Sequence, residues 1–319
     1  MEKIVQNNME KADQNKSVQK ETIEQLWKNA LQKRRKIMGK IYDTEKEECY
    51  LANTESVPAV RFCAFDEFSF VNAAFSTRFG GISKGFLSQL NLGFQRGDDD
   101  KTVARNYTLF CNSIGVSPEN LVLSDQVHDT KLQYVTQEDA CNGTIQKKLK
   151  GIDGIYTDQK NICLATSYAD CVPLFFVDPV KKVIASSHSG WKGTVGKIGQ
   201  KTIQTLEETF QSDRKDIIAV IGPSICQECY EVSRDVIDLF AEAYTAEQMK
   251  QIAYCSNREE EKYQLDLWAA NYIQFEEAGL LPKNIHVSGI CTCCNQELFF
   301  SHRASHGKRG NLNGFLSLC

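Results

Sequence analysis

The sequence has 319 residues, of which 42% are hydrophobic, and its formal net charge at pH 7 is −4. A chain of this size can bury a sizeable hydrophobic core, in one large domain or in two smaller ones. The small acidic excess argues against a protein that binds nucleic acid or lies on a membrane surface, because both need a basic excess.

Residues 1–50 differ in composition from the rest of the chain and are rich in Lys, Glu and Gln. From Glu21 onward, apolar side chains recur at the spacing of an amphipathic helix. These side chains are Ile23, Leu26, Trp27, Ala30, Leu31, Ile37 and Met38. The polar residues before Glu21 are expected to be disordered. We therefore predict an N-terminal extension over residues 1–50, partly disordered and partly helical, and a main domain over residues 51–319. The helix either packs on that domain or binds a protein partner.

The main domain shows short apolar runs interleaved with stretches of helical periodicity. Buried strands are predicted at 162–166, 172–177, 183–187 and 217–221, and helices at 103–114, 194–210, 232–244 and 265–278. Mixed strand and loop is expected at 284–315. This alternation, without an internal repeat, favours a single α/β domain, although it does not give the order of the strands.

Three residues of metal-ligand type stand in distinctive local sequence. His128 follows Ser-Asp-Gln-Val, Cys171 follows Tyr-Ala-Asp, and His188 precedes Ser-Gly-Trp-Lys-Gly. Imidazole and thiolate together bind zinc or copper, and three protein ligands leave one coordination position open for water or substrate. Each residue also has an ordinary interpretation, as a hydrogen-bonded histidine or a buried cysteine. Their wide spacing matches no short metal-binding motif.

The residues around His188 suggest an anion site. Gly190 and Gly193 allow the backbone to approach a ligand closely, and the helix that starts near Thr194 would favour an anion such as phosphate. Next to Cys171, Asp170 is interpreted in two ways, as a carboxylate that orients a ligand histidine or as a residue that caps a turn.

Thirteen cysteines are scattered along the chain. No secretory signal is visible at the N-terminus, and the apolar runs are too short to cross a bilayer, so we expect reduced thiols in a cytoplasmic protein. Two Cys-x-x-Cys pairs, Cys226 with Cys229 and Cys291 with Cys294, could form a structural zinc site. The interval between the pairs is much longer than the usual spacing of about 15–20 residues, which disfavours that site.

A second kind of enzyme fits the same residues, because Cys171 and His188 could form a nucleophile–base pair of a cysteine hydrolase or deamidase. A third interpretation is a non-catalytic domain with a scaffolding N-terminal helix. Copper oxidation is less favoured, since blue-copper sites add a weak axial ligand such as Met. The four methionines all lie outside the three motifs.

Several motifs in a fixed order resemble the YfiH/YlmD family, which contains laccase-domain proteins and was formerly called the multicopper polyphenol oxidase family. The motifs are Phe75-Ser-Thr-Arg-Phe-Gly-Gly, Asn91-Leu-Gly, Gln126-Val-His, Ala169-Asp-Cys-Val-Pro, His188-Ser-Gly-Trp-Lys-Gly, Ile221-Gly-Pro-Ser, Cys291-Thr-x-Cys and Phe299-Phe-Ser-His-Arg. The resemblance covers roughly residues 60–315.

The resemblance implies a four-layer α/β/β/α sandwich with mixed sheets, similar to the catalytic domain of cytotoxic necrotizing factor. It also implies a zinc-dependent purine nucleoside phosphorylase that uses inorganic phosphate and accepts adenosine, inosine, guanosine and methylthioadenosine, with adenosine deaminase activity. The older family name implies Cu²⁺ instead of Zn²⁺. For bacterial members, editing of peptidoglycan precursors is a further alternative.

By the same resemblance, His128, Cys171 and His188 are the catalytic and metal-binding residues. We also predict that Arg78, Asn106 and Lys192 bind substrate or phosphate. Three positions depart from the family pattern: Tyr107 stands where an arginine is expected, Asp129 replaces a glycine, and His302 replaces a tyrosine. The departures at Tyr107 and Asp129 are expected to affect the substrate pocket rather than the metal ligands.

Overall fold

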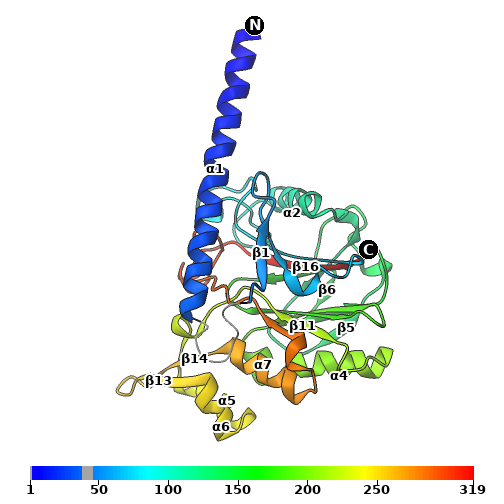
Figure 1. Cartoon of the computed structure of the whole chain (residues 1–319), viewed down its shortest axis with the longest axis vertical. Helices are drawn as coiled ribbons and strands as arrows, with labels where there is room; N and C mark the ends of the chain where they lie inside the picture. The colour runs from blue at the N-terminus through cyan, green and yellow to red at the C-terminus, as the bar shows by residue number, and fades with distance from the viewer. Residues whose placement is uncertain (1, 38–45) are drawn as a thin grey trace.

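The computed structural model describes residues 2–37 and 46–319, with side chains from residue 20 onward. Helix α1 (Glu2–Ile37) begins the chain, and its N-terminal half projects beyond the rest of the molecule (Figure 1). The predicted helix from Glu21 is present, but helical backbone also covers the polar stretch for which disorder was expected. That stretch contains neither Gly nor Pro and is rich in Glu, Lys and Gln, which favour helix. Met38 lies outside the described residues.

The C-terminal half of α1 packs on the main domain. Ile23 and Ala30 are 1% exposed and Trp27 is 8% exposed, so the predicted apolar stripe faces inward. Polar contacts add to this interface: Arg34 Nε donates to the Ser288 carbonyl at 2.9 Å. Strand β1 (Cys49–Ala52), which follows, straddles the predicted boundary between extension and domain.

Two large mixed sheets form the centre of the domain. The first has the order β1, β2 (Ala59–Phe62), β3 (Val71–Ser76), β16 (Leu312–Leu318), β8 (Cys163–Tyr168), β4 (Leu121–Asp125) and β6 (Leu149–Lys150). The second has the order β15 (Ile285–Val287), β11 (Ile218–Ile221), β9 (Val172–Asp178), β10 (Val183–Ser189), β7 (Gly154–Thr157) and β5 (Leu132–Tyr134). The predicted strands at 162–166, 172–177, 183–187 and 217–221 are β8, β9, β10 and β11.

Three hydrophobic cores separate four layers. Helix α2 (Asp100–Ile114) covers the first sheet, and Tyr107 and Phe110 belong to the core between them. The two sheets face each other across a second core that contains Phe75 and Phe175. Helices α4 (Ile198–Phe210) and α7 (Leu267–Glu277) cover the outer face of the second sheet through a third core (Figure 1). The expected α/β/β/α sandwich is therefore confirmed.

The structure corrects two predicted helices. The helix expected over 194–210 is divided into α3 (Trp191–Val195) and α4, because Lys197 adopts a left-handed conformation with φ 57° between them. The helix expected over 232–244 begins later, as α5 (Arg234–Ala243). Its first residues instead form β12 (Glu231–Ser233), because Val232 pairs with Tyr263 of a distant strand.

Helix α6 (Ala246–Ile252) and the hairpin of β13 (Ala253–Asn257) and β14 (Lys262–Leu265) were not predicted. The two strands of the hairpin form a small third sheet with β12, beside α5. Among the residues that the structure describes, no helix is long and apolar enough to cross a membrane.

Candidate functional site

The structure brings His128, Cys171 and His188 together at the junction of the two large sheets. His128 follows β4, Cys171 lies in the turn from β8 to β9, and His188 lies near the end of β10. One donor atom from each residue lies within 4.8 Å of the others. His128 Nε2 is 3.8 Å from Cys171 Sγ. Three motifs that are far apart in the sequence therefore form one cluster.

Asp170 fixes the turn that presents Cys171. It adopts a positive φ of 84°, which is unusual for a residue with a side chain. Its buried carboxylate accepts hydrogen bonds from Thr292 Oγ1 at 2.7 Å, Ser301 Oγ at 3.0 Å and the Arg303 backbone N–H at 2.7 Å. The two interpretations of Asp170 are thereby resolved in favour of the turn, since its hydrogen bonds go to these three groups.

The carboxylate that orients His188 is Asp153, which was not among the predicted site residues. Asp153 Oδ1 lies 2.8 Å from His188 Nδ1. The same carboxylate accepts the backbone N–H groups of Val127, His128 and Asp129, each at 3.0 Å. It therefore holds the His128 turn and the His188 ring together. The sequence signal that could have revealed it is the Asp153-Gly154 pair at the start of β7.

The three side chains form a strongly coupled electrostatic group. Burial alone would disfavour the thiolate of Cys171, but His188 and His128 outweigh burial and lower the pKa of Cys171 to about 6. Burial likewise opposes the charged form of His188, yet Cys171 and Asp153 raise its pKa to about 9. Burial would also raise the pKa of Asp153, but His188 and the backbone N–H donors keep it below its ordinary value. The group thus favours a thiolate at neutral pH.

The donor set fits a metal ion. Because His188 Nδ1 is hydrogen-bonded to Asp153, its Nε2 is free to bind a metal ion. This is the usual arrangement of a metal-bound histidine. Gly190 provides the space: a Cβ at this position would lie 2.9 Å from His128 Cδ2 and 3.2 Å from Cys171 Sγ. Two imidazoles and one thiolate match zinc or copper chemistry and leave a coordination position open.

A pocket of about 380 Å³ opens beside this cluster, a volume that suits a small ligand. Its lining consists of His128, Ala169, Asp170, Cys171, Trp191, Ile225, Tyr230, Leu267, His302, Arg303 and Arg309. The pocket combines aromatic rings with two guanidinium groups. Of these arginines, Arg303 belongs to a motif that was recognised, whereas Arg309 was missed because no local pattern marks it.

The predicted substrate residues lie elsewhere. The guanidinium of Arg78 donates to the carbonyl oxygens of Ser88 and Gln296 and lies over the Phe300 ring. Asn106 is fully buried and donates to Ser83 Oγ and the Asn91 carbonyl. Lys192 Nζ lies 5.5 Å from the centre of the Trp191 ring. None of the three lines the pocket that holds the cysteine.

Of the three departures from the family pattern, His302 lines the pocket, whereas Tyr107 and Asp129 lie outside its lining. Tyr107 is fully buried under the first sheet, where its hydroxyl donates to the Leu92 carbonyl at 2.8 Å and accepts from Asn313 Nδ2 at 2.9 Å. Asp129 contributes its backbone N–H to Asp153. Neither residue lines the pocket, so any effect of Tyr107 or Asp129 on it would be indirect.

Comparisons with known proteins agree with this architecture. The family model described as multi-copper polyphenol oxidoreductase laccase matches residues 72–319. The purine nucleoside phosphorylase YlmD of Bacillus subtilis is 39% identical over 250 residues, which are 78% of this chain and 88% of that protein. The crystal structure of YlmD from Geobacillus stearothermophilus has a TM-score of 0.77 at 33% identity and covers 82% of this chain and 96% of its own. The structure of the Bacillus licheniformis hypothetical protein YfiH has a TM-score of 0.76 with the same identity and coverage.

Proposed function

Because the chain belongs to the multi-copper polyphenol oxidoreductase laccase family, whose relatives include proteins named purine nucleoside phosphorylase, we propose that it is a purine nucleoside phosphorylase. In this reaction inorganic phosphate cleaves the bond between purine and ribose, which yields the free base and ribose-1-phosphate, or 5-methylthioribose-1-phosphate from methylthioadenosine. Adenosine, inosine, guanosine and methylthioadenosine are the proposed substrates. The observation that carries the proposal is one pocket lined both by two arginines and by His128 and Cys171, which belong to a group of three candidate metal ligands.

His128, Cys171 and His188 would hold a zinc ion, which when bound supplies a Lewis acid next to the pocket. Asp153 keeps the His188 ring in one orientation and one tautomer through Nδ1. The proposed side activity, deamination of adenosine, would use the same pocket with water in place of phosphate.

We propose zinc rather than copper as the metal. A blue-copper site needs a weak axial ligand besides two histidines and one cysteine, and that ligand is usually Met. The pocket lining contains no methionine, and Met249 lies in α6 against the third core. Met1 and Met38 are outside the described residues, and Met9 is in the first half of α1, where only the backbone is described.

Arg309 and Arg303 are the proposed phosphate-binding groups. Arg309 is largely buried, and this burial together with the nearby charge of Arg96 lowers its pKa to about 10. Its Nε is buried without a hydrogen-bond partner among the described residues. A desolvated cation with a free donor gains most from a bound anion, and a guanidinium matches the geometry of phosphate. The rings of Tyr230 and Trp191 offer apolar faces for a purine.

Replacing Arg309 by glutamine should raise the KM for phosphate by about 10- to 100-fold, because a hydrogen bond between charged groups contributes roughly 1.5–3 kcal/mol. The KM for the nucleoside should change much less. Steady-state kinetics at varied phosphate concentration measure the difference, and Arg105→Gln, which lies in a separate pocket beside α2, is the matched control. If the KM for phosphate and the KM for the nucleoside changed equally, the assignment of Arg309 to phosphate binding would be wrong.

The proposed function is tested by incubating the purified full-length protein with each nucleoside, with and without phosphate, and identifying the products by mass spectrometry. Phosphorolysis requires phosphate and yields the free base and the sugar-1-phosphate, whereas deamination needs only water and yields inosine from adenosine. If the zinc-loaded protein consumed none of the four nucleosides, the proposal would be refuted.

A second candidate function is a cysteine hydrolase or deamidase, favoured by the low pKa of Cys171 and the Asp153–His188–Cys171 arrangement. A nucleophilic thiolate would be alkylated by iodoacetamide in the zinc-loaded protein, with loss of activity. A metal-bound thiolate should be protected until a chelator removes the ion. In the chelated protein, the alkylation rate should then rise with a midpoint near pH 6 instead of near pH 9.

A further inference from the structure

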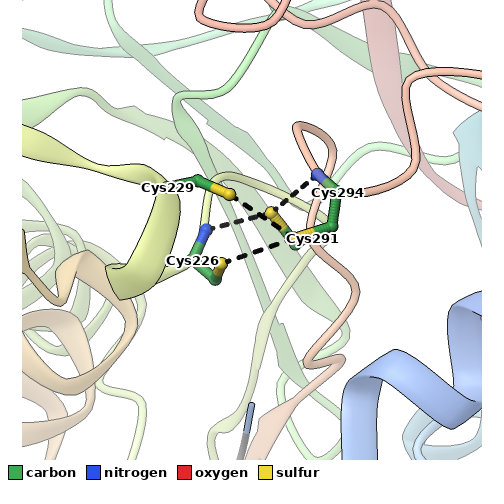
Figure 2. A group of neighbouring side chains, drawn as sticks. All are labelled: Cys226, Cys229, Cys291 and Cys294. Atoms are coloured by element: carbon green, nitrogen blue, oxygen red, sulfur yellow. Dashed lines mark hydrogen bonds between the residues drawn. The ribbon is translucent and has the colours of Figure 1, made fainter. Parts of the chain in front are cut away.

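The second group of cysteines converges in the folded chain despite its unfavourable spacing in the sequence. Cys226 and Cys229 lie in the loop between β11 and β12, and Cys291 and Cys294 lie in a turn after β15. Their four sulfur atoms lie within 4.8 Å of one another. Figure 2 shows the four side chains pointing toward a common centre. The parallel pairing of β11 with β15 explains this convergence, because it carries both loops to the same edge of the sheet.

The separations of the sulfur atoms suit a tetrahedral ion. With zinc–sulfur bonds of about 2.3 Å, four tetrahedral ligands place their sulfur atoms about 3.8 Å apart. Cys294 Sγ is 3.9 Å from Cys226 Sγ and 3.4 Å from Cys229 Sγ. All four cysteines are free thiols. Cys293, in the same turn, is not one of the four converging residues.

The surroundings of the cluster favour thiolates. The backbone N–H groups of Cys226 and Cys294 both donate to Cys291 Sγ at 3.3 Å (Figure 2). A neutral thiol is a weak acceptor, whereas a thiolate accepts such bonds strongly. In addition, Lys33 Nζ of α1 donates to the Cys294 carbonyl at 2.6 Å, which places a positive charge beside the cluster. Apolar packing of cysteines would require neither feature.

We propose that Cys226, Cys229, Cys291 and Cys294 form a structural zinc site, separate from the histidine–cysteine cluster. Zn²⁺ takes four thiolates and the four thiol protons leave to solvent, so the site carries a net charge of −2, which Lys33 partly offsets. All four coordination positions are filled by protein, as in structural rather than catalytic sites.

This zinc site would stiffen one wall of the pocket. The Ile225 backbone N–H, next to Cys226, donates to the Asp170 carbonyl at 3.0 Å, and Thr292, next to Cys291, donates to the Asp170 carboxylate. Tyr230, next to Cys229, lines the pocket. The zinc ion would therefore link the two loops that hold Asp170, the residue that precedes Cys171 in the turn from β8 to β9.

The test uses full-length Cys171→Ser protein, in which the histidine–cysteine cluster lacks its thiolate. After purification from zinc-supplemented medium and dialysis, we expect about one zinc per chain by elemental analysis. Cobalt exchanged into this protein should give intense thiolate-to-cobalt charge-transfer bands and tetrahedral visible bands, because a four-thiolate site differs from a histidine-rich one. The wild-type protein should carry one further metal ion, at the histidine–cysteine cluster. The metal content per chain therefore distinguishes loss of that site from loss of the four-cysteine site.

Adding Cys291→Ser to this protein should remove the remaining zinc and lower the melting temperature, whereas adding Cys293→Ser, the matched control from the same turn, should retain it. If the protein with Cys291→Ser does not fold, the reactivity of the thiols in the Cys171→Ser protein tests the proposal instead. Four of them should resist a thiol reagent until a chelator is added. Absence of bound zinc and cobalt in folded Cys171→Ser protein, or a mass showing that the four cysteines form two disulfides, would overturn the proposal.

Discussion

Replacing Cys171 by alanine is expected to release the metal from the histidine–cysteine cluster and to lower kcat/KM for adenosine phosphorolysis by about 1,000-fold or more. The cluster then keeps two ligands, His128 and His188, which are too few for a stable protein zinc site. Loss of a Lewis acid costs several kcal/mol of transition-state stabilisation, and about 4 kcal/mol corresponds to a factor of roughly a thousand. Elemental analysis and steady-state kinetics measure the two effects.

The control for this experiment is Cys255→Ala, because Cys255 is an exposed cysteine of the β13–β14 hairpin. It should leave both metal content and turnover unchanged. If Cys171→Ala protein lost its metal and still phosphorolysed adenosine at the wild-type rate, the proposed role of the cluster would be wrong.

Replacing Asp153 by asparagine should weaken metal binding at the histidine–cysteine cluster by about 10- to 100-fold, the usual effect of losing a carboxylate behind a ligand histidine. Asparagine keeps the shape of the side chain but removes its charge, while the three backbone N–H groups and His188 still point at it. The free energy of unfolding should also fall, by roughly 1–3 kcal/mol. Competition with a coloured chelator measures the affinity, and denaturant unfolding measures the stability.

A matched control separates the two effects. Asp178 is also a fully buried aspartate that accepts two backbone N–H groups, those of Val180 and Lys181, but it is the last residue of β9, before the turn to β10. Asp178→Asn should lower stability to a similar extent and leave metal affinity unchanged. A similar loss of metal affinity in both variants would show that Asp153 acts only through general stability.

The strands and the ligand motifs could be predicted because their signals are local. Short β-branched runs marked β8, β9 and β10, and His128, Cys171 and His188 stand out by the residues beside them. Contacts between distant segments are harder to predict, because a local signal such as the Asp153-Gly154 pair does not show which residue Asp153 contacts. Asp153 acts on His188 across a pair of neighbouring strands, β7 and β10.

The residues of the pocket were harder to predict than those of the histidine–cysteine cluster. Arg78 and Asn106 stand in distinctive motifs, but these motifs serve buried hydrogen bonds in loops away from the cysteine. Arg309 enters the pocket from the loop before β16, and its importance comes from burial, which a single sequence does not reveal. Distinctive local sequence thus accompanied buried hydrogen bonds in loops at Arg78 and Asn106 as well as candidate metal ligands.

The position of the histidine–cysteine cluster between the sheets has a consequence for how the chain folds. His128 follows a strand of the first sheet, His188 lies within the second, and Cys171 is in the connection from one sheet to the other. An intermediate in which one sheet has formed alone lacks at least one ligand. Tight metal uptake must therefore come late in refolding, after the slow long-range step that brings the two sheets together. The rate of metal capture would then report on the docking of the sheets.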